Sequence, residues 1–273
     1  MNKFKGILFC TDLDGTLFRD DKTVSKENLD AIEYFKSEGG LFTFITGRIP
    51  QTSAQICATV KPNAPYGCLN GAGIYDHESK QYIWRLPLAD GVLELVREVD
   101  RRLPDLGIQF NTDKNILFCK DNDALVYFRA MTGAPYIAAD YESIDDTVLK
   151  IIFAHNDEDR IAAVARLLSE HPLSDRFDFI RSEHRLYEIL PKGASKGRAL
   201  CKMAELFGID QSKTIAIGDY DNDVSMIKAA RLGVAVSNAA VEAKAVADYV
   251  GVSNNESAIA DVVDKLDSGE IAL

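Results

Sequence analysis

Residues 6–17, GILFCTDLDGTL, decide the fold of this chain. The run Gly6 to Thr11 is short and apolar throughout, which predicts a central strand of a parallel sheet that is covered on both faces. Two carboxylates, Asp12 and Asp14, follow this strand directly, and Gly15 permits a sharp turn. Ligands bind at the carboxyl ends of strands in open parallel sheets, so these acids stand where a site is expected. For this stretch alone, a turn with solvated acids is the alternative.

The order of the predicted elements indicates a core with an insertion. In residues 1–85 and 188–273, apolar runs alternate with helical patterns, which is typical of a Rossmann-like, doubly wound α/β core with a parallel sheet. Residues 86–187 give the order helix, two strands, helix, strand, helix, two strands, which predicts an inserted α+β domain with an antiparallel sheet. The elements expected in the core are strands at Gly6–Thr11, Leu41–Ile45, Tyr66–Leu69, Thr214–Ile217 and Leu232–Val236, and helices that begin after Ser25, after Ser195, near Val224 and around Ile259.

Composition and charge limit the class of protein. Hydrophobic residues make up 47% and charged residues 27% of the 273 residues, which predicts a folded chain. The net charge of −11 disfavours nucleic acid and anionic membranes as partners. Five scattered cysteines without a paired motif, and no apolar run of about 20 residues, lead us to expect a cytoplasmic protein. A monomer and a small homo-oligomer are both open.

A second acidic cluster follows another predicted core strand. Residues 218–223, GDYDND, come directly after Thr214–Ile217, so two groups of acids are expected at one edge of one sheet. Their mutual repulsion calls for a divalent cation. The candidate ligands are oxygens, and none of the four histidines lies in either cluster, which favours Mg²⁺ over zinc.

Two further segments offer groups that bind phosphate. Thr46 and Gly47 follow the strand Leu41–Ile45, where a hydroxyl and backbone amides can hold phosphate oxygens. Lys196 lies just inside the helix capped by Ser195 and can bring an ammonium group to the same edge. Taken singly, the first segment is more commonly a helix cap and the lysine a surface residue. Together and in this order, the segments predict a phosphate site.

These motifs resemble the haloacid dehalogenase superfamily, and within it the Cof-type phosphatases of subclass IIB, which carry a large α/β cap between the second and third motifs. The resemblance covers nearly the whole chain. The matching motifs are Asp12-Leu13-Asp14-Gly15-Thr16, Thr46-Gly47-Arg48, Lys196 within residues 191–197, and residues 218–223, accompanied by Asn70-Gly71-Ala72 and Ser237-Asn238-Ala239. Two departures are Val236-Ser237, where relatives commonly have Met-Gly, and residues 254–258, which lack a frequent glycine.

The resemblance implies a Mg²⁺-dependent phosphohydrolase that acts on small phosphorylated metabolites through an aspartyl phosphate. Asp12 would be the nucleophile, and Asp14 would be the acid and base, which requires a raised pKa. The inserted domain would close over the site and select the substrate. The implied metal ligands are Asp12, the Asp14 main-chain carbonyl, Asp219 and Asp223, with Asp223 binding directly or through water, and the implied phosphate-binding residues are Thr46, Gly47, Lys196 and Asn222.

Other functions remain open from the sequence. A phosphotransferase or phosphomutase of the same fold would retain the phosphoryl group on an organic acceptor. A receiver-like signalling domain also forms an aspartyl phosphate, but such domains are shorter and lack an inserted cap. A catalytically silent binding module is disfavoured by the intact motifs. Sugar phosphates are the first expectation for the substrate, followed by flavin mononucleotide and pyridoxal phosphate.

Overall fold

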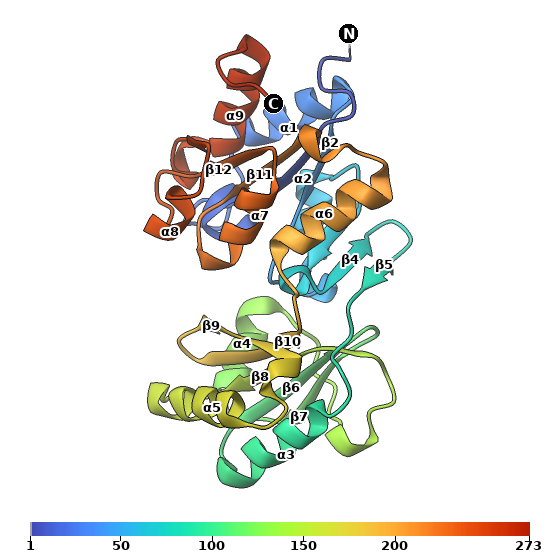
Figure 1. The fold of residues 1–273 in the computed structure, drawn as a ribbon, viewed down its shortest axis with the longest axis vertical. Coiled ribbons are helices and arrows are strands. Elements are labelled where there is room, and N and C mark those ends of the chain that lie inside the picture. The colour runs from blue at the N-terminus through green and yellow to red at the C-terminus, as the bar shows by residue number, and fades with distance from the viewer. Residues whose placement is uncertain (1) are drawn as a thin grey trace. The chain divides into compact units, whose positions relative to one another are not determined.

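The computed structural model describes residues 2–273, which divide into two compact units (Figure 1). Unit 1 comprises the chain up to Ile83 and from Ser195 onward, and unit 2 comprises Trp84–Ala194. The boundary placed at 187/188 from the sequence falls inside strand β10, Leu186–Pro191. This strand is hydrogen-bonded along its length to two neighbouring strands of unit 2, so all of it belongs to that unit.

A parallel sheet of five strands forms the centre of unit 1. Its strands are β1 (Leu8–Thr11), β2 (Leu41–Phe44), β11 (Thr214–Gly218), β12 (Leu232–Ala235) and β13 (Tyr249–Val250), in the order β13-β12-β11-β1-β2. The chain proceeds from β1 to β2 on one side and later adds β11 on the other. The carboxyl ends of β1 and β11 therefore flank the point where ligands bind in doubly wound sheets. The predicted α/β core is confirmed.

Helices pack on this sheet and complete the core of unit 1. They are α1 (Lys26–Ser37), α2 (Ala54–Val60), α6 (Lys196–Phe207), α7 (Val224–Ala229), α8 (Val241–Lys244) and α9 (Ala258–Ser268). The predicted caps are present: Ser25 Oγ accepts a hydrogen bond from the amide of Asn28 (3.2 Å), and Ser195 Oγ accepts one from Arg198 (3.1 Å). The cap at Ser195 fixes where α6 begins, and so where Lys196 lies.

Strand β3, Tyr66–Cys68, differs from the sequence prediction. It does not continue the central sheet, and instead forms an antiparallel sheet with β4 (Gly73–Asp76) and β5 (Gln81–Arg85). An isolated bridge between Ile45 and Gly67 connects it to the end of β2. The turn after β4 explains the hairpin, because the Asp76 carboxylate accepts hydrogen bonds from the amide of Glu78 and the hydroxyl of Ser79.

Unit 2 has the predicted order of elements and an antiparallel sheet. Its elements are α3 (Val92–Arg102), β6 (Gly107–Thr112), β7 (Ile116–Lys120), α4 (Asp123–Thr132), β8 (Val148–Ala154), α5 (Glu158–Glu170), β9 (Phe177–Glu183) and β10. The sheet order is β7-β6-β8-β10-β9. One face packs against α3 and α5 through a hydrophobic core that includes Leu95, Phe110, Phe153 and Val164. The opposite face carries several buried polar side chains.

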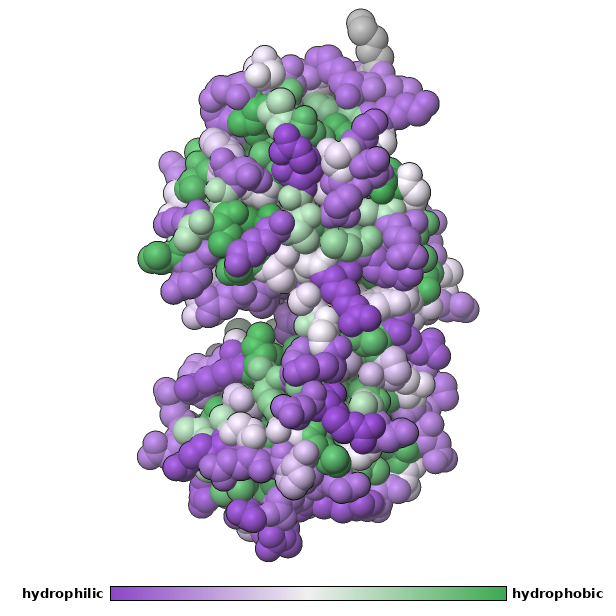
Figure 2. Space-filling model, viewed as in Figure 1, coloured by the Kyte–Doolittle hydropathy of each residue, from purple (hydrophilic) through white to green (hydrophobic). Residues whose placement is uncertain are grey.

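The visible surface of each unit is mainly hydrophilic, with hydrophobic residues in small groups (Figure 2). Within residues 2–273, no helix has the length and apolar character that crossing a membrane requires.

Candidate active site

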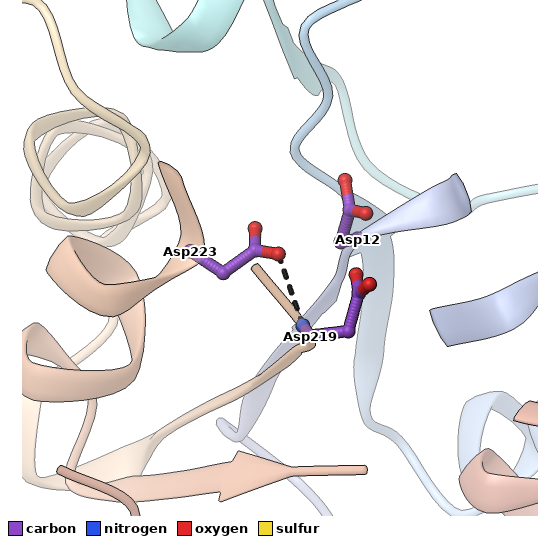
Figure 3. A group of neighbouring side chains, drawn as sticks. All are labelled: Asp12, Asp219 and Asp223. Atoms are coloured by element: carbon purple, nitrogen blue, oxygen red, sulfur yellow. Dashed lines mark hydrogen bonds between the residues drawn. The ribbon is translucent and has the colours of Figure 1, made fainter. Parts of the chain in front are cut away.

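Three carboxylates meet at the carboxyl edge of the unit 1 sheet. Asp12 follows β1, Asp219 follows β11, and Asp223 lies in the short helical turn that precedes α7. Each offers an oxygen within 4.8 Å of the other two (Figure 3). Asp12 is 6% exposed and Asp223 is completely buried. The structure thus brings together the two acidic clusters that lie more than half the chain apart in sequence.

Lys196 places a buried ammonium group between two of these carboxylates. Its Nζ lies 2.5 Å from Asp12 Oδ1 and 2.6 Å from Asp223 Oδ1, and the residue is 1% exposed. Burial acts to lower the pKa of Lys196, but the charges of Asp12 and Asp223 outweigh burial and raise it. Lys196 therefore stays charged and offsets part of the negative charge of the cluster.

The remaining negative charge fits a divalent cation. Burial, followed by the charge of Asp223, raises the pKa of Asp12 to about 8 despite the neighbouring lysine. Burial and Asp223 likewise raise the pKa of Asp219 to about 6. When all three carboxylates are ionised, they outnumber the one ammonium group, and a bound divalent cation would offset the excess negative charge and favour the ionised form. Hard oxygen donors are the ligands that Mg²⁺ prefers. The Asp cluster can therefore hold a metal ion.

Asp223 is also held by the backbone. Its Oδ2 accepts a hydrogen bond from the amide of Asp219 (3.0 Å; Figure 3) and another from the amide of Tyr220 (3.1 Å). Its Oδ1 faces Lys196 Nζ. Both oxygens thus have protein partners. Through Oδ2, Asp223 fixes the backbone turn at Asp219. Its Oδ1 holds the Lys196 ammonium group and is the oxygen that faces the other carboxylates.

The side chain of Asp14 does not join the other three carboxylates. It accepts two hydrogen bonds from the guanidinium of Arg48, both 2.9 Å, and one from Lys22 Nζ at 3.0 Å. Burial acts to raise the pKa of Asp14, but Arg48 and then Lys22 outweigh burial and lower it. The raised pKa expected from the sequence is wrong for this arrangement, because the expectation did not include the two cations.

The residues proposed to bind phosphate lie on neighbouring loops. Thr46 is buried at the end of β2, and its hydroxyl accepts a hydrogen bond from the amide of Arg48 (3.1 Å). Asn222 donates from Nδ2 to Asn70 Oδ1 (3.1 Å). The same Asn70 Oδ1 would lie 2.9 Å from a Cβ at position 47, so a larger residue there would displace the Asn70 side chain. Asn70 thus joins the loop of Gly47 to the loop of Asn222.

A model of the haloacid dehalogenase-like hydrolase family matches residues 9–263, which include all of these loops. The chain belongs to the haloacid dehalogenase-like hydrolases. The putative phosphatase YxeH of Bacillus subtilis is 29% identical over 274 residues, with 95% of this chain and 97% of that protein covered. The Bacillus subtilis 5-amino-6-(5-phospho-D-ribitylamino)uracil phosphatase YitU is 27% identical over 269 residues, with 94% and 96% covered. The chloroplastic endoribonuclease YBEY of Arabidopsis thaliana is 28% identical over 272 residues, which is 94% of this chain but 45% of that protein.

Solved structures of this family share the fold. A haloacid dehalogenase-like hydrolase from Bacteroides thetaiotaomicron has a TM-score of 0.85 at 25% identity, with 95% of this chain and 99% of that chain covered. The subclass IIB sugar phosphatase BT4131 has a TM-score of 0.80 at 21% identity, with 97% and 100% covered. The resemblance to the haloacid dehalogenase superfamily that the motifs predicted is confirmed by the family model, and the solved structures agree in fold. The family and the phosphatases among its relatives identify this hydrolase as a phosphoric monoester hydrolase.

Several residues that support the site of this hydrolase escaped the sequence analysis. Thr16 Oγ1 donates to Asp219 Oδ1 (3.0 Å), and Asn238 Nδ2 donates to the carbonyl of Gly15 (2.8 Å). A Cβ at position 15 would lie 2.4 Å from Asp219 Oδ2, so only glycine lets the two loops approach. Thr16 and Asn238 stood within recognised motifs, but the sequence contains no signal for their partners.

Proposed function

We propose that this hydrolase removes phosphate from small phosphorylated metabolites with the help of Mg²⁺, with Asp12 as the nucleophile. The Asp12 carboxylate carries the proposal, because it lies both in the metal-binding group and 2.5 Å from the Lys196 ammonium. The Lys196 ammonium group and the proposed Mg²⁺ would both attract phosphate oxygens, and so would bring a phosphate ester up to the Asp12 carboxylate. Sugar phosphates are the first substrate class, in agreement with the names of the relatives that act on ribitylamino and sugar phosphates.

The proposed reaction has two displacements. Asp12 attacks phosphorus and the bond to the organic oxygen breaks, which forms an aspartyl phosphate. Asp14 gives its proton to the departing oxygen, and then takes a proton from the water that attacks the aspartyl phosphate and releases inorganic phosphate. In the pairing with Arg48 and Lys22, Asp14 is in the ionised form that accepts the proton of water. To act as the acid, its carboxyl group must carry a proton and part from Arg48.

The other site residues bind and orient. We propose that Thr46, the Gly47 amide, Lys196 and Asn222 hold the phosphoryl oxygens. Mg²⁺, held by Asp12, the Asp14 carbonyl, Asp219 and Asp223, would neutralise charge on the phosphoryl group when bound. Unit 2 would serve as the cap that selects the organic part of the substrate. We also propose that the protein acts in the cytoplasm, in keeping with the scattered cysteines of its sequence.

The experiment is a panel of phosphorylated metabolites assayed for inorganic phosphate with and without Mg²⁺. We expect Mg²⁺-dependent release from at least one sugar phosphate, and loss of turnover in Asp12→Asn without loss of folding. Asp21→Asn, which changes an exposed acid outside the cluster, is the matched control and should keep turnover. Normal turnover by Asp12→Asn would remove Asp12 as nucleophile. Transfer of the phosphoryl group to an organic acceptor, without release of phosphate, would make the protein a phosphotransferase.

A further inference from the structure

The turn that carries Asp14 is held at two points by a segment near the C-terminus of the chain. The turn comprises residues 13–17, and the segment comprises residues 253–257, directly before α9. Both belong to unit 1. The segment contains Asn254, a buried side chain that is 2% exposed and lies 236 positions of sequence from its hydrogen-bond partner Phe18. This contact therefore exists only in the folded protein.

Asn254 holds the chain around the turn with both its side chain and its main chain. Its Nδ2 donates to the Phe18 carbonyl and to Asp20 Oδ1, both at 3.0 Å. Its main-chain amide donates to Asn238 Oδ1 at 2.9 Å, and Asn238 Nδ2 donates in turn to the Gly15 carbonyl at 2.8 Å. Asn254 thus fixes the residues directly after the turn and, through Asn238, a carbonyl group inside it.

The segment around Asn254 is fixed independently of the turn. Ser253 and Glu256 form a capping box, in which Glu256 Oε2 accepts hydrogen bonds from the amide of Ser253 (3.1 Å) and from its hydroxyl (2.7 Å). Ser257 has a left-handed φ of 67°, and its hydroxyl donates to Ser25 Oγ (2.9 Å) at the start of α1. Because these bonds tie the segment to α1 without involving the turn, Asn254 supports the turn rather than the reverse.

The proposed acid step gives this support a purpose. Arg48 and Lys22 hold the Asp14 side chain in the structure, but Asp14 must part from Arg48 to act on the departing oxygen. Its position then depends on the backbone of the turn. Gly15, with a φ of 80°, has no side chain that could fix this backbone from within. A shift of about 1 Å in the turn would carry Asp14 away from the reacting atoms.

We propose that Asn254 is a positioning residue for Asp14, which it holds through the backbone of the turn and not through the carboxyl group. The inference rests on the proposed function, because it takes Asp14 to protonate the departing oxygen. Loss of Asn254 should therefore affect phosphate esters according to their need for an acid. A hexose 6-phosphate releases an alkoxide, which needs the proton, whereas p-nitrophenyl phosphate releases a stabilised phenolate that needs it much less.

The test measures kcat/KM for these two esters in the full-length protein, because kcat/KM covers the step in which the organic group departs. In Asn254→Ala, we expect kcat/KM to fall roughly 10- to 100-fold for the hexose phosphate and less than about 3-fold for the aryl phosphate.

Asn28→Ala is the matched control. Asn28 is also buried, and its Oδ1 accepts hydrogen bonds from the amides of Ile259 and Ala260 in α9, both at 3.0 Å. Its loss weakens the contact between α1 and α9 and leaves the hydrogen bonds of Asn254 to the turn in place. The control should lower the melting temperature and keep the wild-type ratio between the two esters, which separates loss of stability from loss of positioning.

A second variant decides the test if Asn254→Ala does not fold. Asn238 is exposed, so Asn238→Ala should fold while it removes the bond to the Gly15 carbonyl. We expect it to lower the ratio of hexose phosphate to aryl phosphate roughly 3- to 10-fold. A folded Asn254→Ala that keeps the wild-type ratio overturns the inference. Where that variant does not fold, an Asn238→Ala that keeps the ratio overturns it instead.

Asp14→Asn separates this inference from the function on which it rests. It should lower the same ratio at least as far as Asn254→Ala does. If Asp14→Asn affects both esters alike, or if the wild type cleaves neither, the proposed function is wrong and the inference fails with it. If Asp14→Asn lowers the ratio and a folded Asn254→Ala does not, the role of Asn254 alone is wrong.

Discussion

The Asp14 side chain is positioned by two residues, Arg48 and Lys22, to which the sequence analysis assigned no role. Arg48 holds it with two hydrogen bonds, and its guanidinium also lies 5.3 Å from the centre of the Phe18 ring. Lys22 adds one bond from a side chain that is 66% exposed, compared with 34% for Arg48. Exposed ion pairs contribute little because water screens them, so Arg48 is the more important partner.

We therefore predict that Arg48→Met lowers kcat roughly 10- to 100-fold, because Arg48 holds ionised Asp14 in place as the base for the attacking water, and a base displaced by about 1 Å loses much of its effect. KM should change less, since Arg48 faces Asp14. Lys22→Met is the control and should change kcat by less than about 3-fold. Steady-state kinetics on one phosphate ester measures both variants. Equal effects of the two substitutions would show that Arg48 does not position Asp14.

At the level of single residues, the sequence indicated which residues come together better than it indicated which charges surround each of them. Asp12, Asp219 and Lys196 could be singled out because each follows a strand or opens a helix, and the structure brings them together. The lowered pKa of Asp14 could not be predicted, since it depends on two cations whose distances are set by the folded loops. Asn70 was visible only as part of an Asn-Gly turn, and its contact with Asn222 spans 152 positions of sequence.

The segment Leu69–Gly71 is an element with an unusual backbone that organises three loops of the site. Its residues have φ values of 56°, 54° and 91°, all in the left-handed region. The amide of Leu69 donates to the carbonyl of Arg48, and the amide of Asn70 donates to that of Thr46. A Cβ at Gly71 would lie 2.0 Å from the Ser195 carbonyl, at the start of α6. The segment thus fixes the loops of Thr46, Asn222 and Lys196 together.

We predict that Asn70→Gly weakens binding of inorganic phosphate, measured as competitive inhibition, by roughly 10-fold, the equivalent of about 1.4 kcal/mol. Glycine tolerates the left-handed backbone, so the substitution removes only the side chain that accepts the hydrogen bond of Asn222 and lies beside Gly47. Asn63→Gly is the matched control. Asn63 bonds the backbone of Phe42 and Gly40 at the other end of β2, so its loss should destabilise the fold without changing phosphate binding. Unchanged phosphate inhibition in Asn70→Gly would contradict the role of this segment.

Helices and strands were predicted where the sequence has a clear apolar pattern. They were missed where the element forms only because it pairs with another strand. The order of elements in unit 2 followed from the sequence, as did the strands β1, β2, β11 and β12. The hairpin β4–β5 was missed, because its burial is uneven and its partner is β3, which the apolar pattern assigned to the central sheet. Short α8 and β13 were also missed, because neither contains an apolar run like those of the four-residue strands β1, β2 and β12.

At the scale of the whole molecule, the site adds to an already unfavourable charge balance. The chain carries a net charge of −11, and folding brings Asp12, Asp219 and Asp223 within 4.8 Å of one another. Assembling like charges in a buried place opposes folding, as the raised pKa values of Asp12 and Asp219 indicate. A cation bound by the folded state alone should offset this penalty.

We predict that Mg²⁺ raises the thermal unfolding midpoint of the wild-type protein, and that a chelator reverses the effect. At a concentration 100 times the dissociation constant, binding to the folded state alone stabilises it by about 2.7 kcal/mol. Asp219→Asn, which removes one charge and one ligand, should show a smaller Mg²⁺ dependence and a higher midpoint than the wild type in the chelator. A midpoint that responds equally to Mg²⁺ in both proteins would place the ion elsewhere.

The central claim is that Asp12 itself receives the phosphoryl group. The most direct measurement is rapid acid quenching of the enzyme during turnover with Mg²⁺, followed by mass spectrometry of its peptides. We expect one phosphoryl group on the peptide that contains Asp12, formed and lost at rates compatible with turnover, and none in Asp12→Asn. Steady release of phosphate with no phosphorylated peptide at any time, or with the label on another residue, would contradict the account.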